Sequence, residues 1–369
     1  MFPANYLERY VERVEEDLRE MRGLAGQWRA HLPKLVDSVY FGGGTPSLLP
    51  ADLIGRLFVA IRSTFVIDAN AEITMECAPG QIEDATLAAM IEGGVNRISF
   101  GVQSFIDEEA KHTGRLHTRE IALRDIERVR NTGISRVNLD LIAGLPGQTR
   151  LSWQESLEVL CSADQDHASI YMLEVDEDSR LGREIGSGGL KYYAPQVPTD
   201  DAIAEMYVEG AEILAASGLA QYEISNYAAP SAESRHNLKY WRREPYLGLG
   251  LDAHSMLRDA DGRALRFAMT DKLEPFLDSP GWSEPQRLTR ENELEEAWFL
   301  GLRLNDGVNI AQLRAEFGEG AVARFEPIIS DLASNDLIER TKSHVKLTMR
   351  GRLLSNEVFS RFLAEPVNA

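Results

Sequence analysis

The sequence contains very little cysteine. Of its 369 residues only Cys77 and Cys161 are cysteines, and they lie far apart. This excludes a disulfide framework and favours a reducing, cytoplasmic environment. Two isolated thiols are also too few to hold an iron–sulfur cluster, which usually needs three or four thiolate ligands.

Long apolar runs and a surplus of positive charge are missing as well. No stretch of about 18 apolar residues occurs, so we expect no transmembrane helix. The segment from Met1 to Tyr6 lacks the basic start and apolar core of a signal peptide. Acidic residues outnumber basic ones by 58 to 39, which gives a net charge of −19. Because such a chain repels phosphates, we do not expect it to bind nucleic acid.

Short apolar runs alternate with longer amphipathic segments over the first half of the chain. After a charged helix from Tyr6 to Met21, this pattern predicts βα units and a parallel sheet. The lack of a dinucleotide-binding fingerprint favours an α/β barrel over a doubly wound sheet. The expected strands span 36–41, 71–76, 95–101, 134–143 and 168–175, and the expected helices span 53–64, 84–92, 118–131 and 152–163.

The pattern changes beyond residue 200. A helix over 200–217 precedes an irregular stretch, 222–250, which is rich in aromatic, asparagine and glycine residues. The end of the chain predicts a small domain similar to a winged helix, whose low positive charge favours a packing or regulatory role over DNA binding. We place the domains at 1–285 and 286–369. The second domain is expected to contain helices at 292–304, 310–317 and 321–334, an extended segment at 337–348 and a last helix to Leu363.

A glycine run follows the first expected strand. Gly42, Gly43 and Gly44 precede Thr45 and Pro46. Three glycines allow the backbone to approach a ligand closely and expose N–H groups, and Thr45 adds a hydroxyl. A plain tight turn is the alternative, but the combination favours a small-molecule site at the mouth of the barrel.

Polar side chains also follow the next three strands. Glu76 offers a carboxylate that can pair with an amino group, although a solvated loop acid is an equally good interpretation. Gln103 ends its strand, and Arg115 can pair with a carboxylate. Asp140 lies in an apolar strand and needs a partner, either a structural one or a ligand hydroxyl. Together these groups suit an amino acid joined to a nucleoside.

The irregular stretch contains the segment HNLKYW, which starts at His236. A histidine close to a Tyr-Trp pair could be an axial haem ligand. From the residues alone, a buried histidine bonded to backbone is the more common case. His254, which follows a glycine-rich loop, is a second candidate.

In combination these motifs resemble those of the HemW group, radical S-adenosylmethionine (SAM) relatives of oxygen-independent coproporphyrinogen III oxidase. The resemblance runs from about Tyr6 to Leu363 and implies a partial TIM-like barrel that binds SAM, with a small C-terminal domain. It implies that Gly43, Gly44 and Thr45 contact the methionine amino group, that Glu76, Gln103, Arg115 and Asp140 make the other SAM contacts, and that His236 binds haem. The motifs are GGGTPS, NRISFGVQSF, NLDLIAGLPGQT, YEISNYA, HNLKYW and YLGLGLDAHS.

The chain departs from this family in one respect. Members hold a 4Fe-4S cluster with a Cys-x-x-x-Cys-x-x-Cys motif after the first barrel strand, and neither the motif nor that strand is present. Cys77 and Cys161 cannot replace it. Without the cluster, SAM has no electron donor. Because the chain opens directly in a helix, we expect an N-terminal truncation rather than a degenerate, cluster-free homologue.

The resemblance implies a haem chaperone that transfers haem to acceptor proteins, among them membrane-associated respiratory proteins, with a homodimer as one allowed assembly. An oxidase-like radical SAM enzyme of porphyrin biosynthesis is the first alternative. A cluster-free, non-enzymatic homologue is the second.

Overall fold

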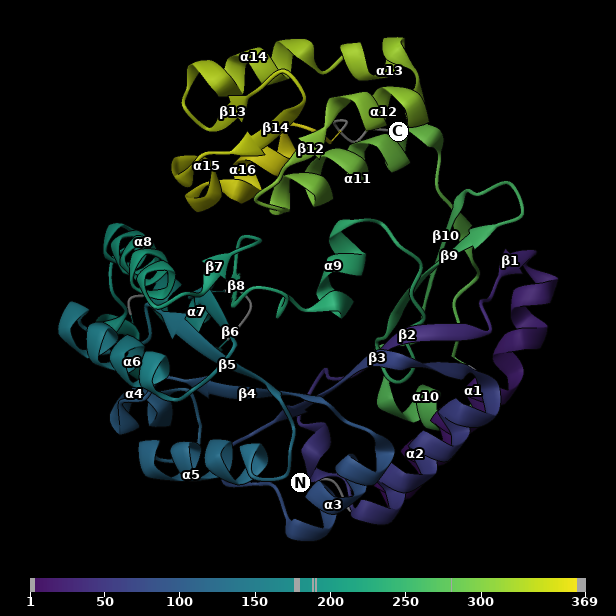
Figure 1. Ribbon diagram of the computed structural model, residues 1–369, viewed down its shortest axis with the longest axis vertical. Coiled ribbons are helices and arrows are strands. Elements are labelled where there is room, and N and C mark those ends of the chain that lie inside the picture. The colour runs from purple at the N-terminus through teal and green to yellow at the C-terminus, as the bar shows by residue number, and fades with distance from the viewer. Residues whose placement is uncertain (1–3, 176–179, 188, 190, 280, 364–369) are drawn as a thin grey trace. The chain divides into compact units, whose positions relative to one another are not determined.

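The computed structural model describes residues 4–175, 180–187, 189, 191–279 and 281–363 (Figure 1). The chain forms two compact units. The first consists of Met1–Val39, Leu49–Ala71 and Ser234–Ala369, and the second of Tyr40–Leu48 and Glu72–Glu233. The expected SAM-contacting residues therefore all belong to the second unit, whereas His236 belongs to the first. The boundary after residue 285 stays a prediction.

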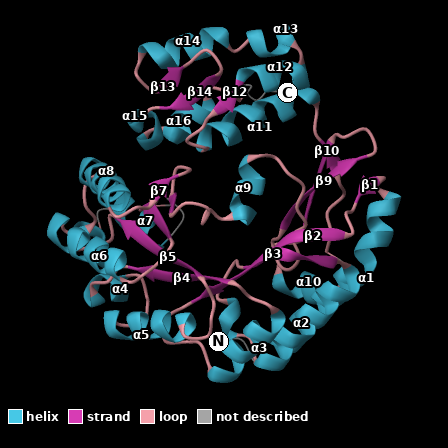
Figure 2. Cartoon of the chain, in the orientation of Figure 1, coloured by secondary structure: helices cyan, strands magenta, loops and turns pink. Residues whose placement is uncertain are grey.

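A seven-stranded, curled sheet carries most of the second unit (Figure 2). Its order is β2-β3-β4-β5-β6-β8-β7. Neighbours from β3 to β6 run parallel, and β8 is antiparallel to both β6 and β7. This confirms the expected partial α/β barrel. The strands are β2 (Leu35–Phe41), β3 (Val66–Cys77), β4 (Arg97–Gln103), β5 (Arg136–Ala143), β6 (His167–Met172), β7 (Ala220–Gln221) and β8 (Asn226–Ala228).

Helices alternate with these strands as the sequence predicts. On α6, a capping box at Thr149 and Ser152 satisfies backbone N–H groups at the helix start. The fully buried Trp153 then donates its indole N–H to the Met206 carbonyl of α8, at 2.7 Å. The helices of this unit are α3 (Asp84–Gly93), α4 (Asp107–His112), α5 (Arg119–Arg130), α6 (Arg150–Ser162), α7 (Arg180–Gly186) and α8 (Asp200–Ala216), with 3-10 helices η1 (Pro46–Leu48) and η2 (Lys191–Gln196).

One face of this sheet is polar. Along β4, Ile98, Phe100 and Val102 are completely buried on one side. Side chains alternate along a strand, so Ser99 and Gln103 lie on the other side. Strand register places Glu76 beside Ser99 and Asp140 beside Ser169 on that same side. A face of this kind is suited to a polar ligand.

The first unit opens with α1 (Ala4–Gln27), which extends the expected helix at both ends. Its buried residues Val11, Val14, Leu18, Met21 and Ala25 recur every three or four positions, the spacing of an amphipathic helix. Before the C-terminal elements, the first unit also contains α2 (Ala51–Thr64), α9 (Arg235–Trp241), α10 (Leu273–Asp278) and a four-stranded sheet, β1-β9-β10-β11. Its strands are β1 (Ala30–His31), β9 (His254–Asp259), β10 (Ala264–Ala268) and β11 (Gln286–Arg287).

The C-terminal residues form the expected helices around a three-stranded sheet, β12-β14-β13. The predicted helix over 321–334 is wrong as one element, because the chain breaks between α13 and α14, and the predicted last helix to Leu363 likewise forms two helices, α15 and α16. The predicted irregular stretch 222–250 also contains β8 and α9. The elements are α11 (Arg290–Arg303), β12 (Val308–Asn309), α12 (Ile310–Phe317), α13 (Glu319–Ala323), α14 (Glu326–Ser334), β13 (Ile338–Arg340), β14 (His344–Leu347), α15 (Met349–Leu353) and α16 (Ser355–Ser360). Within the described part of the chain, we find no helix of the length and apolarity that a bilayer crossing requires.

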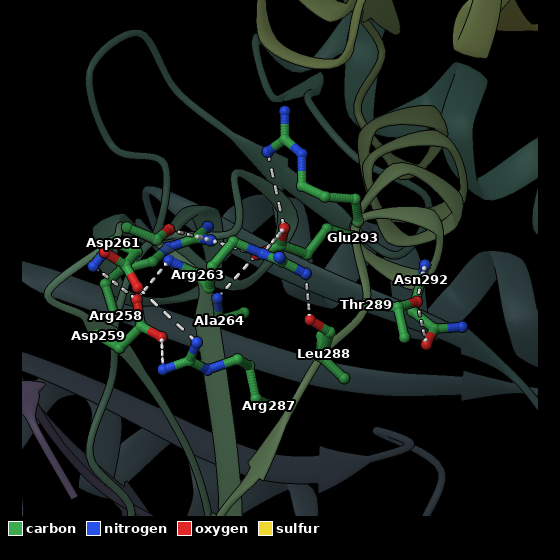
Figure 3. A network of polar contacts seen from close by, with 12 residues as sticks. Arg258, Asp259, Asp261, Arg263, Ala264, Arg287, Leu288, Thr289, Asn292 and Glu293 are labelled. Atoms are coloured by element: carbon green, nitrogen blue, oxygen red, sulfur yellow. Dashed lines mark hydrogen bonds and ion pairs between the residues drawn. The ribbon is translucent and has the colours of Figure 1, made fainter.

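Glu293 connects α11 to the β9–β10 hairpin (Figure 3). Its side chain is only 3% exposed. One carboxylate oxygen accepts from Arg258 Nη1 at 3.1 Å and from the Ala264 N–H at 2.7 Å, and the other accepts from Arg263 Nε at 3.0 Å. Because a buried carboxylate must be paired, the network fixes the position of α11 on the hairpin.

We expect Glu293→Ala to lower the free energy of unfolding by roughly 2–3 kcal/mol, because charged and backbone donors lose their acceptor. Glu326→Ala is the matched control. Glu326 pairs with Arg340 through side chains that are 35% and 43% exposed, so its loss should cost less than about 1 kcal/mol. Urea unfolding followed by circular dichroism measures both, and equal losses would contradict the structural role of Glu293.

Candidate ligand-binding sites

The glycine run and Glu76 form one connected loop structure. Glu76 Oε1 accepts from the Tyr40 hydroxyl at 2.8 Å, and Oε2 accepts from the Gly43 N–H at 3.2 Å. Gly43 has a φ of +82°, which favours glycine. A Cβ on Gly42 would lie 2.5 Å from Tyr40 Cε1 and 2.8 Å from Glu76 Oε1. Only glycine therefore allows the loop to approach this carboxylate.

The open side of the loop faces away from these contacts. A Cβ built on Gly43 or Gly44 would meet no atom within 4 Å, so a ligand could approach the backbone there. Thr45 follows and accepts the Leu48 N–H through its carbonyl. Burial raises the pKa of Glu76, whereas its hydrogen bond from Tyr40 lowers that pKa and nearby Asp140 raises it. A ligand ammonium group would stabilise the ionised carboxylate.

Gln103 and Arg115 meet at Gly101. A Cβ on Gly101 would lie 3.0 Å from Arg115 Nη2 and 3.1 Å from Gln103 Nε2. Gln103 adopts a φ of +69° next to an irregularity in the β4–β5 register, which turns its side chain at the strand end. Among the described residues, no carboxylate lies within ion-pair distance of Arg115. Its guanidinium therefore remains available for a ligand carboxylate.

Asp140 has structural hydrogen-bond partners, as the first of its two interpretations from the sequence predicts. Its carboxylate accepts from Asn138 Nδ2 at 2.7 Å and from Ser99 Oγ at 3.2 Å. Burial raises the pKa of Asp140, and hydrogen bonds from Ser169, Asn138 and Ser99 oppose this. His167 Nδ1 lies 2.6 Å from Asn138 Oδ1 and extends the network. Asp140 is thus held in one orientation before any ligand arrives.

Sequence analysis did not single out several of these partners. Tyr40, Ser99, Asn138 and Ser169 each hold a predicted site residue in place. The two-residue period of the strands could have identified them. Each of these residues lies either an even number of positions from a site residue on the same chain segment or beside a site residue on the next strand. Polar residues that repeat on one face of an otherwise apolar strand mark such a face.

His236 lies on α9 in the first unit. Its Nδ1 is 3.0 Å from Ser38 Oγ, and its Nε2 is 2.9 Å from the Tyr240 hydroxyl. Both ring nitrogens therefore lie within hydrogen-bond distance of a side-chain hydroxyl. Burial lowers the pKa of His236 to about 4, aided by Lys239 and opposed by Asp37. The imidazole is neutral at physiological pH, which is the form that binds metals. His254, the other candidate, is exposed at the start of β9.

The two cysteines do not provide a cluster site. Cys77 ends β3 and is buried. This burial raises the pKa of its thiol to about 12. Cys161 lies on α6. Over the described ranges, no group of three His, Cys, Asp or Glu side chains is suited to a metal ion. The residues present do not fit a 4Fe-4S cluster.

We expect Gly42→Ala to lower the free energy of unfolding of the ligand-free protein by roughly 1–3 kcal/mol, because the new methyl group displaces Tyr40 or Glu76. Gly44→Ala is the control, since its Cβ would meet open space, and it should change stability by less than about 0.5 kcal/mol. Thermal unfolding of the two variants measures the difference. Indistinguishable curves would argue against the close packing of Gly42 on Glu76.

Two family models match parts of the chain. The Radical SAM superfamily model matches residues 3–160, and the HemN C-terminal domain model matches residues 288–354. The chain is also similar, at 22% identity and a TM-score of 0.80, to coproporphyrinogen III oxidase (HemN) from Escherichia coli, across 96% of this chain and 83% of that one. That likeness shows a shared fold.

Curated relatives extend over nearly the whole chain. The heme chaperone HemW of Bacillus subtilis (strain 168) is 32% identical over 362 residues, which cover 97% of this chain and 92% of that protein. The heme chaperone HemW of Escherichia coli (strain K12) is 32% identical over 333 residues, with 89% and 85% covered. On this evidence the chain belongs to the HemW family of the radical SAM superfamily.

Proposed function

We propose that this protein binds haem through His236 and transfers it to acceptor proteins, as a haem chaperone. The observation that carries the proposal is the neutral, hydroxyl-bonded imidazole on α9, in a chain whose relatives are named heme chaperones. A partly buried histidine with a pKa of about 4 keeps its lone pair available to iron throughout the physiological pH range.

The two hydroxyl partners suggest which nitrogen binds iron. Ser38 Oγ can accept the Nδ1–H, which fixes the tautomer and orients the ring. Nε2 then carries the lone pair and accepts from the Tyr240 hydroxyl. Nε2 would be the atom that holds iron once Tyr240 gives way, and Ser38 would keep the ring oriented. Tyr240 packs edge-on against Tyr246, with ring centroids 4.6 Å apart, and these rings provide an apolar surface beside the ligand.

We further propose that the second unit binds SAM. The Gly43–Thr45 backbone and Glu76 would hold the methionine amino group, and Arg115 the carboxylate. Gln103 and Asp140 would contact the remaining polar groups. The open space above Gly43 and Gly44 and the guanidinium of Arg115 support this assignment. When bound with a reduced cluster, SAM supplies radical chemistry, but this chain's described residues do not fit a cluster and we assign no radical step to it.

Haem titration tests the main proposal. We expect the wild-type protein to shift the haem Soret band with saturation, and His236→Ala to bind at least about tenfold more weakly, because the axial ligand is lost. His254→Ala is the matched control and should bind as the wild type does. Equal binding by the His236 variant and the wild type, or no binding by either, would overturn the assignment.

The lowered pKa of His236 predicts a characteristic pH dependence. Since folding favours neutral His236, its contribution to stability is complete above the unfolded pKa of about 6.5 and is lost as the pH falls towards about 4. Haem affinity should likewise persist below pH 6.5. His236→Gln removes this contribution, so the stability difference between wild type and variant should shrink between pH 6.5 and 4. A difference that is independent of pH would contradict the lowered pKa of His236.

A further inference from the structure

The carboxyl end of α9 rests on the C-terminal part of the chain. The guanidinium carbon of Arg303, from α11, lies 4.2 Å from the centroid of the Trp241 ring, within the range of a cation–π contact. Arg303 also lies 6.0 Å from the Phe359 ring of α16. Trp241 is the last residue of the His236-bearing segment, so this contact acts directly on the helix that presents the histidine.

A second contact follows two residues later. Both terminal nitrogens of Arg243 donate to Glu316 of α12, at 3.1 and 2.7 Å, in the bidentate geometry that fixes orientation as well as distance. The Arg243 side chain is only 13% exposed. Its carbonyl accepts from Arg258 Nη2 at 2.9 Å, and Arg258 in turn pairs with Glu293 (Figure 3). The chain leaving α9 is thus fixed to both α12 and the Glu293 network.

Two further contacts, made by the first and middle turns of α9, join the helix to β2, which precedes it by about 200 residues. Lys239 donates to Asp37 at 2.9 Å, and His236 contacts Ser38, both on β2. A helix of seven residues has little stability of its own. Its orientation must therefore come from the contacts at its two ends, and the contacts to α11 and α12 are those that the HNLKYW motif alone does not reveal.

We propose that Arg303 and Glu316 are positioning residues for haem binding: through Trp241 and Arg243 they set the orientation of α9 and hence of the His236 ring. This inference rests on the proposed haem-binding function. Neither residue touches the imidazole, so each acts through α9. The C-terminal region then has a defined task, which is to hold the haem-binding helix in its ligating position.

The test compares Arg303→Leu, Arg303→Lys and Arg340→Leu in the full chain. Leucine removes the cation over Trp241, lysine restores one, and Arg340→Leu removes an exposed ion pair elsewhere in the C-terminal region. We expect Arg303→Leu to bind haem about tenfold more weakly, with a changed high-spin to low-spin ratio in the visible spectrum. Arg303→Lys should recover most of the affinity, and Arg340→Leu should match the wild type.

A second measurement needs no haem. Hydrogen exchange of the amides over 235–243 should become faster in Arg303→Leu and in Glu316→Gln, and should stay unchanged in Arg340→Leu. Glu316→Gln keeps the side-chain shape but loses the charge, so it tests the Arg243 contact if the Arg303 variants fold poorly. Wild-type haem affinity, spectrum and exchange in both the Arg303→Leu and Glu316→Gln variants would overturn the inference.

The two proposals fail in different ways. If wild-type protein binds haem through His236 and the Arg303 and Glu316 variants bind identically, only the positioning role is wrong. If His236→Ala binds haem as the wild type does, the proposed function is wrong and the positioning role falls with it. Faster amide exchange over α9 without any loss of haem affinity would also overturn the inference, because the contacts would then be structural alone.

Discussion

The cost of burying a polar group without a partner governs the architecture of both candidate sites. In the second unit, Glu76 and Asp140 are partly buried acids, and each is held by several donors before any ligand is present. In the first unit, the same cost accounts for the two arginines on Glu293 and the two hydroxyls on His236. Satisfying these groups fixes their side chains, and fixed side chains are what ligand recognition requires.

The two units use this constraint for different purposes. Around Asp140 the hydrogen bonds come from neutral side chains on its own strand and on neighbouring strands, and they oppose the rise that burial causes in its pKa. Around His236 partial burial keeps the ring neutral, and each ring nitrogen lies within hydrogen-bond distance of a hydroxyl. The first arrangement suits a charged small molecule, and the second suits a metal-bearing ligand.

The alternation of strands and helices was sufficient to predict the α/β architecture from the sequence, because hydrophobic periodicity reflects burial. The ligand site at the glycine run stays a prediction. The packing of Gly42 against Tyr40 could not be predicted, since that contact depends on the exact path of the loop. The helix α9 was not predicted because seven residues are too few to show a helical period. The break between α13 and α14 was not predicted because the apolar spacing continues across it. Arg303 contacts Trp241 of α9, and Glu316 contacts Arg243 just after it. These partners lie about 60 to 80 positions apart in the sequence, and the residue pattern does not reveal side-chain pairs at such a separation.

The discontinuity of the first unit has a consequence for synthesis on the ribosome. Met21 and Ala25 of α1 form a buried cluster with Leu257 and Phe267, which are translated more than 200 residues later. At about 5–20 residues per second, the Met21–Ala25 end of α1 waits on the order of ten seconds or more for these partners, while the second unit completes its own core. During that interval α1 has α2 as a partner, but this end of its apolar stripe is not yet covered. The first transient partner of this end is therefore expected to be a general folding chaperone that shields apolar surface.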